Sequence, residues 1–257
     1  MTNILVCIKR VPDTSGDVQL SEDGMTIDAR HLGHTLSAHE ECAIAIAAEL
    51  AASSDGMATA LSLGAGDAQE QLRHAVALGC GAAILLEAEP DSFGPADVAQ
   101  AIAAVVRDRK ESGAGFDLIL LGTDAADTGD FQVAVRLAYQ LNLPVLTGIV
   151  TVGIDGDTVT ARGTGPDGTE VYELPMPAVI AIQEGGVEPR YPSIPGRMRA
   201  KRTEIETLPP AVSPRGSGRV RLTLPPAHPG TVKVLGEDAT AAPALVDVLS
   251  ELGVVSK

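Results

Sequence analysis

The chain has 257 residues, a formal net charge of −15 at pH 7, and only 2% aromatic residues. This length suits one large α/β domain, or one domain with an extension, whose core must consist of small aliphatic side chains. The acidic balance argues against nucleic acid as a partner, because binding phosphates requires a net basic face.

The apolar runs are too short to cross a bilayer; the longest include residues 118–121 and 179–182. Met1 leads directly into a predicted strand without a signal-peptide pattern, so we expect a soluble, cytoplasmic protein with no membrane insertion. The cysteines stand in apolar surroundings without Cys-x-x-Cys spacing, which favours buried, reduced thiols over metal ligands. They are Cys7, Cys42 and Cys80.

Strands and helices are predicted to alternate over the first 141 residues. Ser37 and Glu40 have the spacing of a capping box, which marks the start of the first helix. This alternation indicates βαβ units and therefore a doubly wound, mostly parallel sheet. The predicted strands are 3–8, 57–63, 82–87 and 117–121, and the predicted helices are 37–52, 68–78, 95–109 and a last helix that ends at 141.

After Pro144 the pattern changes to short strands of alternating polarity, at residues 150–152, 158–162 and 169–174. Asp-Gly pairs between them favour tight turns, so a small antiparallel hairpin insertion is expected at about 145–176. Residues 177–182 then return to the core as a strand.

The segment that follows this strand changes from buried to exposed and basic. Pro189, Pro192 and Pro195 favour an extended backbone, and one or two helical turns are predicted from Gly196. We expect an α/β domain over residues 1–206. Residues 207–257 are rich in Pro, Gly and Ser and are expected to form an extended C-terminal arm that ends in a helix, residues 242–252.

Ligands of open parallel sheets bind beyond the carboxyl ends of the strands. Three loops follow such ends, at residues 7–13, 63–66 and 122–132, although each by itself is also typical of an ordinary connection. The chain has no Walker loop, no GxGxxG after the first strand, no nucleophile elbow and no metal-binding histidine pair. We therefore expect no catalytic residue and no metal site.

The string EPRYPSIPGRMRAKR, residues 188–202, closely resembles the signature segment of the electron-transfer flavoprotein β subunit family, which includes the FixA proteins. The likeness extends from Asn3 to about Thr207. It implies a Rossmann-like fold of the adenine-nucleotide-binding type. It also implies a heterodimer with an α subunit that carries electrons from flavin dehydrogenases of the acyl-CoA dehydrogenase type towards a quinone reductase.

By the same resemblance the protein is an electron carrier and not an enzyme. FAD is held mainly by the α subunit, and AMP is a structural ligand of this chain. The implied cofactor-binding positions are Cys7, Lys9, Asp13, Ser37, Leu63, Gly64, Gly122, Asp127, Gly129, Asp130, Gln132 and Val133. The implied positions for docking dehydrogenases are Gly186, Val187, Glu188, Arg190 and Tyr191.

The chain departs from the family pattern where the phosphate loop is expected. Gln132 matches the pattern, but Ala134 replaces a glycine and Asp130 adds a negative charge where a phosphate would lie. Two alternatives stay open: a flavin-free regulatory module that binds adenine nucleotides, and a scaffold without a nucleotide. The identity of the dehydrogenase and of the acceptor, the choice between AMP and a second FAD, and electron bifurcation also stay open.

Overall fold

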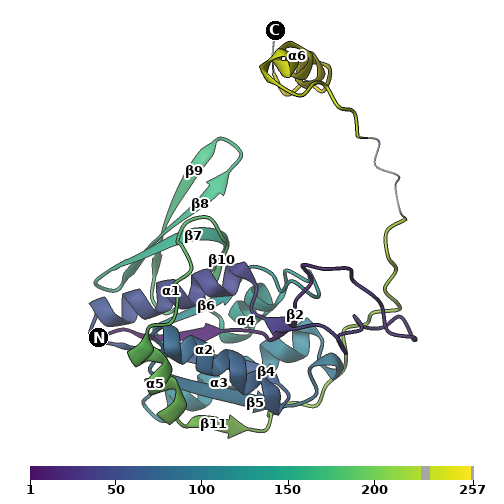
Figure 1. Ribbon diagram of the computed structural model, residues 1–257. Helices are drawn as coiled ribbons and strands as arrows, with labels where there is room; N and C mark the ends of the chain where they lie inside the picture. Colours follow the sequence, from purple (N-terminus) through teal and green to yellow (C-terminus); the bar gives the residue numbers. More distant parts are fainter. Residues whose placement is uncertain (227–231, 256–257) are drawn as a thin grey trace. The chain divides into compact units, whose positions relative to one another are not determined.

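The computed structural model describes residues 1–226 and 232–255, in which two compact units are distinguished, residues 1–222 and residues 223–257. Within the described residues, nine strands of the first unit form one sheet with the order β11-β5-β4-β1-β6-β10-β7-β8-β9 (Figure 1). A separate two-stranded sheet pairs β2 with β3. The strand bounds are β1 Asn3–Cys7, β2 Val11–Pro12, β3 His34–Thr35, β4 Met57–Gly64, β5 Ala82–Glu87, β6 Leu118–Gly122, β7 Val145–Asp155, β8 Thr158–Gly165, β9 Gly168–Pro175, β10 Ala178–Ile182 and β11 Ile205–Leu208.

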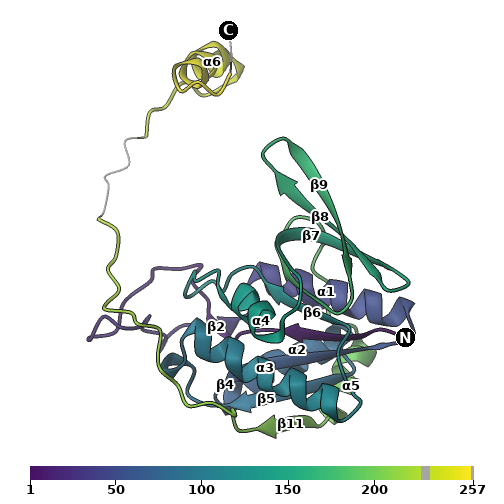
Figure 2. The ribbon, with the colours of Figure 1, turned by 180° about the vertical axis from the view of Figure 1, so that it is seen from behind.

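The central strands are parallel, as the alternation of strands and helices predicts. β1 lies between β4 and β6 and pairs in parallel with both. Its residues form a continuous apolar run because helices cover both faces of the sheet. Helices α1, α2 and α5 pack on one face and α3 and α4 on the other, so the sheet is doubly wound (Figures 1 and 2).

Helices α1 and α3 begin where the local sequence predicts, whereas α5 begins at Ile194, two residues before the predicted Gly196. Ser37 caps α1 in a capping box, in which its hydroxyl accepts from the N–H of Glu40 and the Glu40 carboxylate accepts from the N–H of Ser37. A 3₁₀ turn, Gly66–Ala68, precedes α2, so this helix begins one residue later than expected. The helix bounds are α1 Ala38–Ser53, α2 Gln69–Leu78, α3 Pro95–Glu111, α4 Val133–Leu141 and α5 Ile194–Arg202.

The predicted antiparallel strands are present, but they continue the main sheet. β7 starts in parallel with β10 at Val145 and Leu146, passes a register shift near Gly148, and then pairs antiparallel with β8. Gly148 has φ +69°, a conformation that glycine adopts without strain. β7 is therefore much longer than residues 150–152, because one strand serves both the parallel core and the hairpin.

Two predictions at the C-terminal side of the domain need correction. Pro195 does not extend the chain but lies in the first turn of α5, where a missing N–H costs no hydrogen bond, and Ser193 caps that turn. Thr207 and Leu208, expected in the arm, belong to β11, which pairs in parallel with β5 at the edge of the sheet. The exposed hydrogen-bonding edge of β5 provides this pairing, which the sequence of the segment does not reveal.

The second unit contains the predicted C-terminal helix, α6 Ala242–Glu251, after a 3₁₀ turn, Ala239–Ala241. Leu245, Val246 and Leu252 are exposed. Residues 227–231 and 256–257 of the expected arm lie outside the described residues. None of the helices within the described ranges has both the length and the apolar character needed to cross a lipid bilayer.

Candidate functional site

A pocket opens at the carboxyl ends of β1, β4 and β6. The chain runs from β1 outward to β4 and β5, and then returns to place β6 on the other side of β1. The connections after β1 and β6 therefore leave the sheet on opposite faces, which creates the switch point where open α/β sheets bind ligands. The cavity has a volume of about 140 Å³ and is partly open to solvent.

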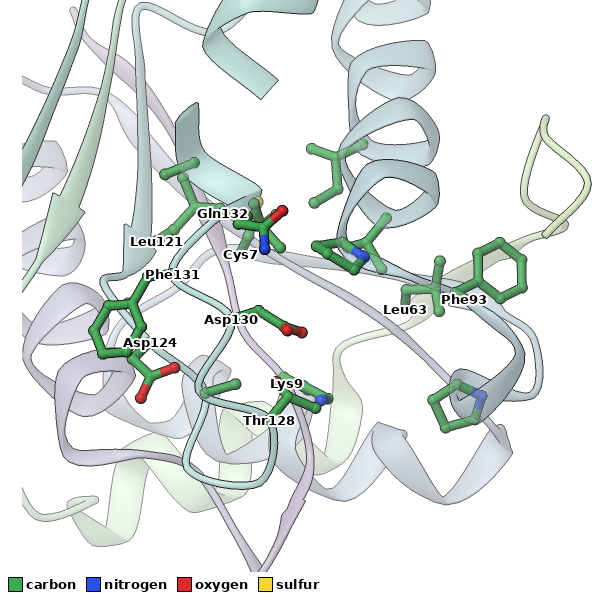
Figure 3. A pocket seen from close by; sticks show the side chains of 18 of the residues that line it. Cys7, Lys9, Leu63, Phe93, Leu121, Asp124, Thr128, Asp130, Phe131 and Gln132 are labelled. Carbon is green, nitrogen blue, oxygen red and sulfur yellow. The ribbon is translucent and has the colours of Figure 1, made fainter. Parts of the chain in front are cut away.

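One wall of the pocket is apolar. Leu63 lies in β4, Leu121 lies in β6, and Phe93 lies in the turn before α3 (Figure 3). Val98 and Ile102 of α3 complete this wall. A wall of such apolar side chains can cover a flat ring system.

The β1 side of the pocket is formed by Cys7, Lys9 and Glu40. Oε1 of Glu40 accepts a hydrogen bond of 2.7 Å from the backbone N–H of Lys9, and Ser37 donates to its other oxygen. Burial nevertheless raises the pKa of Glu40 to about 7, since desolvation of the carboxylate outweighs these hydrogen bonds. Burial, with a smaller contribution from Glu40, also raises the pKa of the Cys7 thiol.

The loop from Gly122 to Gln132 forms the opposite side, and Lys9 joins it to β1. Nζ of Lys9 lies 2.7 Å from Oδ2 of Asp127 in an ion pair. The side chain of Asp130 points into the pocket (Figure 3). Two buried atoms on this side, Oγ1 of Thr123 and Oδ1 of Asp124, have no hydrogen-bond partner within the described part of the chain. Such atoms can bind the hydroxyl or amino groups of a ligand.

Helix α4 begins at this loop. Its N-cap, Gln132, makes no side-chain cap, because its Oε1 accepts instead from Nε and Nη2 of Arg136. The N–H groups of the first turn therefore lack a side-chain acceptor. An uncapped helix start of this kind favours a bound anion.

Seven of the twelve implied cofactor positions line the pocket: Cys7, Lys9, Leu63, Gly122, Asp130, Gln132 and Val133. Five do not: Asp13, Ser37, Gly64, Asp127 and Gly129. Ser37 and Asp127 act on the site indirectly, because they hydrogen-bond to Glu40 and Lys9, which do line it. Asp13 is exposed, and its carboxylate accepts from the N–H of Ser15 in its own loop.

Several lining residues were not predicted from the sequence, among them Phe93, which precedes α3, and Ser217 and Arg219, which come from the expected arm. Thr128 and Phe131 also line the pocket; they belong to the candidate loop at residues 122–132 but were not among the implied cofactor positions. No local signal marks Ser217 or Arg219, because their surroundings have the composition of a linker.

The implied docking positions divide into two groups. Gly186 and Val187 contact the domain: a Cβ at Gly186 would lie 2.0 Å from the carbonyl oxygen of Val150, and Val187 packs against the core. Glu188, Arg190 and Tyr191 are exposed. Three exposed apolar residues fall in this part of the chain, Tyr191 before α5 and Ile194 and Met198 on it, and they are 96%, 80% and 47% exposed.

Fold and site together define a Rossmann-like α/β protein with a pocket at the switch point of its sheet. The family model described as "Electron transfer flavoprotein domain" matches residues 24–213. The chain belongs to the electron transfer flavoprotein family, as the resemblance of residues 188–202 indicates.

Relatives of this chain carry the name of the β subunit. "Electron transfer flavoprotein subunit beta" of Bacillus subtilis (strain 168) is 33% identical over 208 residues, 80% of this chain and 78% of the relative. The protein of the same name from Syntrophomonas wolfei is 32% identical over 249 residues, 95% of this chain and 94% of the relative. "Acryloyl-CoA reductase electron transfer subunit gamma" of Anaerotignum propionicum is 32% identical over 199 residues, 76% of this chain and 73% of the relative.

These relatives confirm the predicted class. The chain is similar to β subunits of electron transfer flavoproteins, which are electron carriers rather than enzymes and are associated with flavin. They do not favour the alternative of a flavin-free regulatory module or scaffold.

Proposed function

We propose that the chain pairs with an electron transfer flavoprotein α subunit, binds an adenine nucleotide such as AMP in the pocket between β1 and β6, and covers part of an FAD held mainly by that subunit. The pocket at the switch point carries this proposal. When bound, the flavin supplies the electron-accepting and electron-donating chemistry. The residues of this chain bind the nucleotide, orient the cofactors and shield them from solvent.

Three features of the pocket fit an adenine nucleotide. The apolar wall around Leu63, Leu121 and Phe93 can cover an adenine ring. The uncapped start of α4 can donate backbone hydrogen bonds to a phosphate. The buried oxygens of Thr123 and Asp124 can bind ribose hydroxyl groups, which would satisfy their hydrogen bonds.

One feature opposes a phosphate in this pocket. Asp130 lines it, and a carboxylate repels a phosphate at short range. Lys9 offers limited compensation, since it is paired with Asp127. A further positive charge is needed for tight binding.

A second surface suits a protein partner. Tyr191 precedes the strongly basic helix α5, and Ile194 and Met198 belong to it; all three expose apolar side chains. Buried aromatic and aliphatic anchors carry much of the energy of protein interfaces. We assign this surface, together with Glu188 and Arg190, to the docking of a flavin dehydrogenase of the acyl-CoA dehydrogenase type, from which electrons pass towards a quinone reductase.

Co-expression with an α subunit tests the assignment. We expect a yellow heterodimer whose absorbance spectrum gives its flavin content and whose acid extract contains AMP. A colourless chain that does not co-purify with the α subunit would contradict the proposal. A yellow heterodimer whose extract contains a second equivalent of FAD and no AMP would contradict only the assignment of the nucleotide.

A further inference from the structure

Residues 215–222, here called the tethered segment, reach the pocket although the sequence predicts them within an extended arm. Oδ2 of Asp97 accepts hydrogen bonds from the backbone N–H groups of Arg215 and Gly216, at 2.8 and 3.0 Å. At the other end, the N–H of Leu222 donates to the carbonyl oxygen of Gly24 at 2.7 Å. The segment is therefore fixed to the domain on both sides of Arg219.

At the first of these attachments, near Asp97, the backbone of the segment lies against the start of α3. A Cβ added at Gly94, the N-cap of α3, would lie 2.2 Å from the carbonyl oxygen of Gly216. The backbones of α3 and the tethered segment thus touch, which only glycine permits at this position. Asp97 itself is buried and also accepts from the N–H of Gly94.

Arg219 is the charged residue that this segment contributes to the pocket. Its half-buried side chain lines the pocket, and Nη1 donates to the carbonyl oxygen of Met25 at 2.9 Å. No carboxylate pairs with it among residues 1–226 and 232–255. Because the bond to Met25 uses one of five N–H donors and leaves the charge uncompensated, the guanidinium can still bind an anion.

The charges of the pocket require such a group. Its other cationic side chain, Lys9, is paired with Asp127, whereas four carboxyl groups line the pocket, those of Glu40, Asp91, Asp124 and Asp130. We propose that Arg219 binds the phosphate of the nucleotide and offsets the repulsion from Asp130, so that the tethered segment makes the pocket selective for nucleotides over nucleosides. This inference depends on the proposed function, since it assumes that an adenine nucleotide enters the pocket. Arginine suits the role because its planar fork matches the oxygens of a phosphate.

Isothermal titration calorimetry of the full chain in its heterodimer, after removal of bound nucleotide, tests the inference with AMP and adenosine as probes. We expect Arg219→Gln to weaken AMP binding about tenfold or more and adenosine binding less than about twofold, because only AMP carries the phosphate. Arg219→Lys should restore part of the AMP affinity, since it keeps the charge but not the fork.

Arg221→Gln is the matched control. Arg221 lies two residues further along the same segment, is exposed, and does not line the pocket. The variant makes the same change in charge and should leave both affinities unchanged.

Three results would overturn the inference. If Arg219→Gln weakens AMP no more than Arg221→Gln does, the phosphate is bound by other groups, although the proposed function stands. If Arg219→Gln weakens AMP and adenosine equally, the residue only shapes the pocket. If the unaltered heterodimer binds no AMP, the nucleotide assignment itself fails, and this inference fails with it.

Discussion

The carboxylate of Glu40 accepts a hydrogen bond of 2.7 Å from the backbone N–H of Lys9, and this contact joins the first turn of α1 to the end of β1. The same carboxylate completes the capping box with Ser37. A group that stabilises a helix start thus also shapes the floor of the pocket. Because burial raises the pKa of this carboxyl group, both the stability of the helix start and the charge in the pocket depend on pH.

We expect the stability of the protein to fall as Glu40 ionises. Burial raises the pKa of Glu40 from 4.5 to about 7, so the folded state binds this proton more tightly than the unfolded chain. The resulting stabilisation is complete below about pH 4.5 and is lost as the pH rises through about 7. Relative to Glu40→Gln, the free energy of unfolding of the unaltered protein should fall by about 2 kcal/mol from about pH 5 to about pH 8. Urea unfolding curves at several pH values measure this difference, and parallel pH profiles for the two proteins would contradict it.

Glu41 should hold the pKa of His74 above its ordinary value. Nε2 of His74 lies 3.0 Å from Oε1 of Glu41, and this hydrogen bond raises the pKa of the imidazole against the effect of burial. We expect Glu41→Gln to lower the pKa of His74, measured by NMR titration. Glu49→Gln, on the same helix, should leave it unchanged.

The pair contributes to stability with the sign expected of a raised histidine pKa. Its stabilisation is fully present below the ordinary pKa of 6.5 and is lost as the pH rises through the raised value. A His74 pKa that does not differ between Glu41→Gln and the unaltered protein would show that the contact has no such effect.

Asp97 should hold the tethered segment in place. Although desolvation would raise its pKa, hydrogen bonds from the backbone N–H groups of Arg215, Gly94 and Gly216 hold it below the usual 3.8. We expect Asp97→Asn to reduce the free energy of unfolding by about 2 kcal/mol at neutral pH, since it weakens charge-assisted hydrogen bonds. The difference in the free energy of unfolding between the two proteins should narrow as the pH falls through the pKa of Asp97, because protonation removes the charge that Asp97→Asn also removes.

Hydrogen exchange gives a local measurement for the same variant. The amides of residues 215–222 should exchange faster in Asp97→Asn than in the unaltered protein. Asp108→Asn, an exposed position on the same helix, is the control. Equal exchange in all three proteins would show that other contacts hold the segment.

Gly196 should be essential for the packing of α5. A Cβ at this position would lie 2.2 Å from the carbonyl oxygen of Ala77, so the helix contacts α2 through bare backbone. We expect Gly196→Ala to cost about 2 kcal/mol or more in the free energy of unfolding, because the two helices must separate. Gly16→Ala introduces the same methyl group where nothing lies within 4 Å and should be nearly neutral in chemical denaturation.

We expect Ile194 to contribute to the binding of a partner protein and not to the stability of the fold. Its side chain is 80% exposed in the first turn of α5. Ile194→Asp should change the free energy of unfolding by less than about 0.5 kcal/mol. It should slow the reduction of the heterodimer's flavin by a dehydrogenase about tenfold, as expected for the loss of an apolar anchor. Val171→Asp on β9 alters an exposed apolar residue far along the chain and serves as the control; equal rates for both variants would exclude Ile194 from the docking surface.

Much of the domain could be predicted from the sequence, because its elements carry strong local signals. The apolar runs of β1, β5 and β6 are short and continuous, as in strands covered on both faces, and Ser37 with Glu40 marks the start of α1. The parallel order follows from their alternation with helices. The family followed from residues 188–202, whose mixture of proline, tyrosine and basic residues is specific.

The parts that could not be predicted depend on contacts between distant residues. β11 forms because β5 offers it an edge, and β7 is long because β10 pairs with its first half and β8 with its second. The pocket was only partly anticipated for the same reason: seven of its residues are positions that the family resemblance implies, whereas Arg219 arrives through hydrogen bonds to Asp97 and Gly24 made by its neighbours.

The amino-acid sequence by itself thus determined the class of fold, the family and the strand ends at which the pocket opens, since these depend on local hydrophobic periodicity and on a characteristic string of residues. Only the tertiary structure decided which side chains meet in the pocket and with what charge. The pairing of Lys9 with Asp127 and the approach of Arg219 join residues more than a hundred positions apart, and such contacts leave no periodic pattern in the chain.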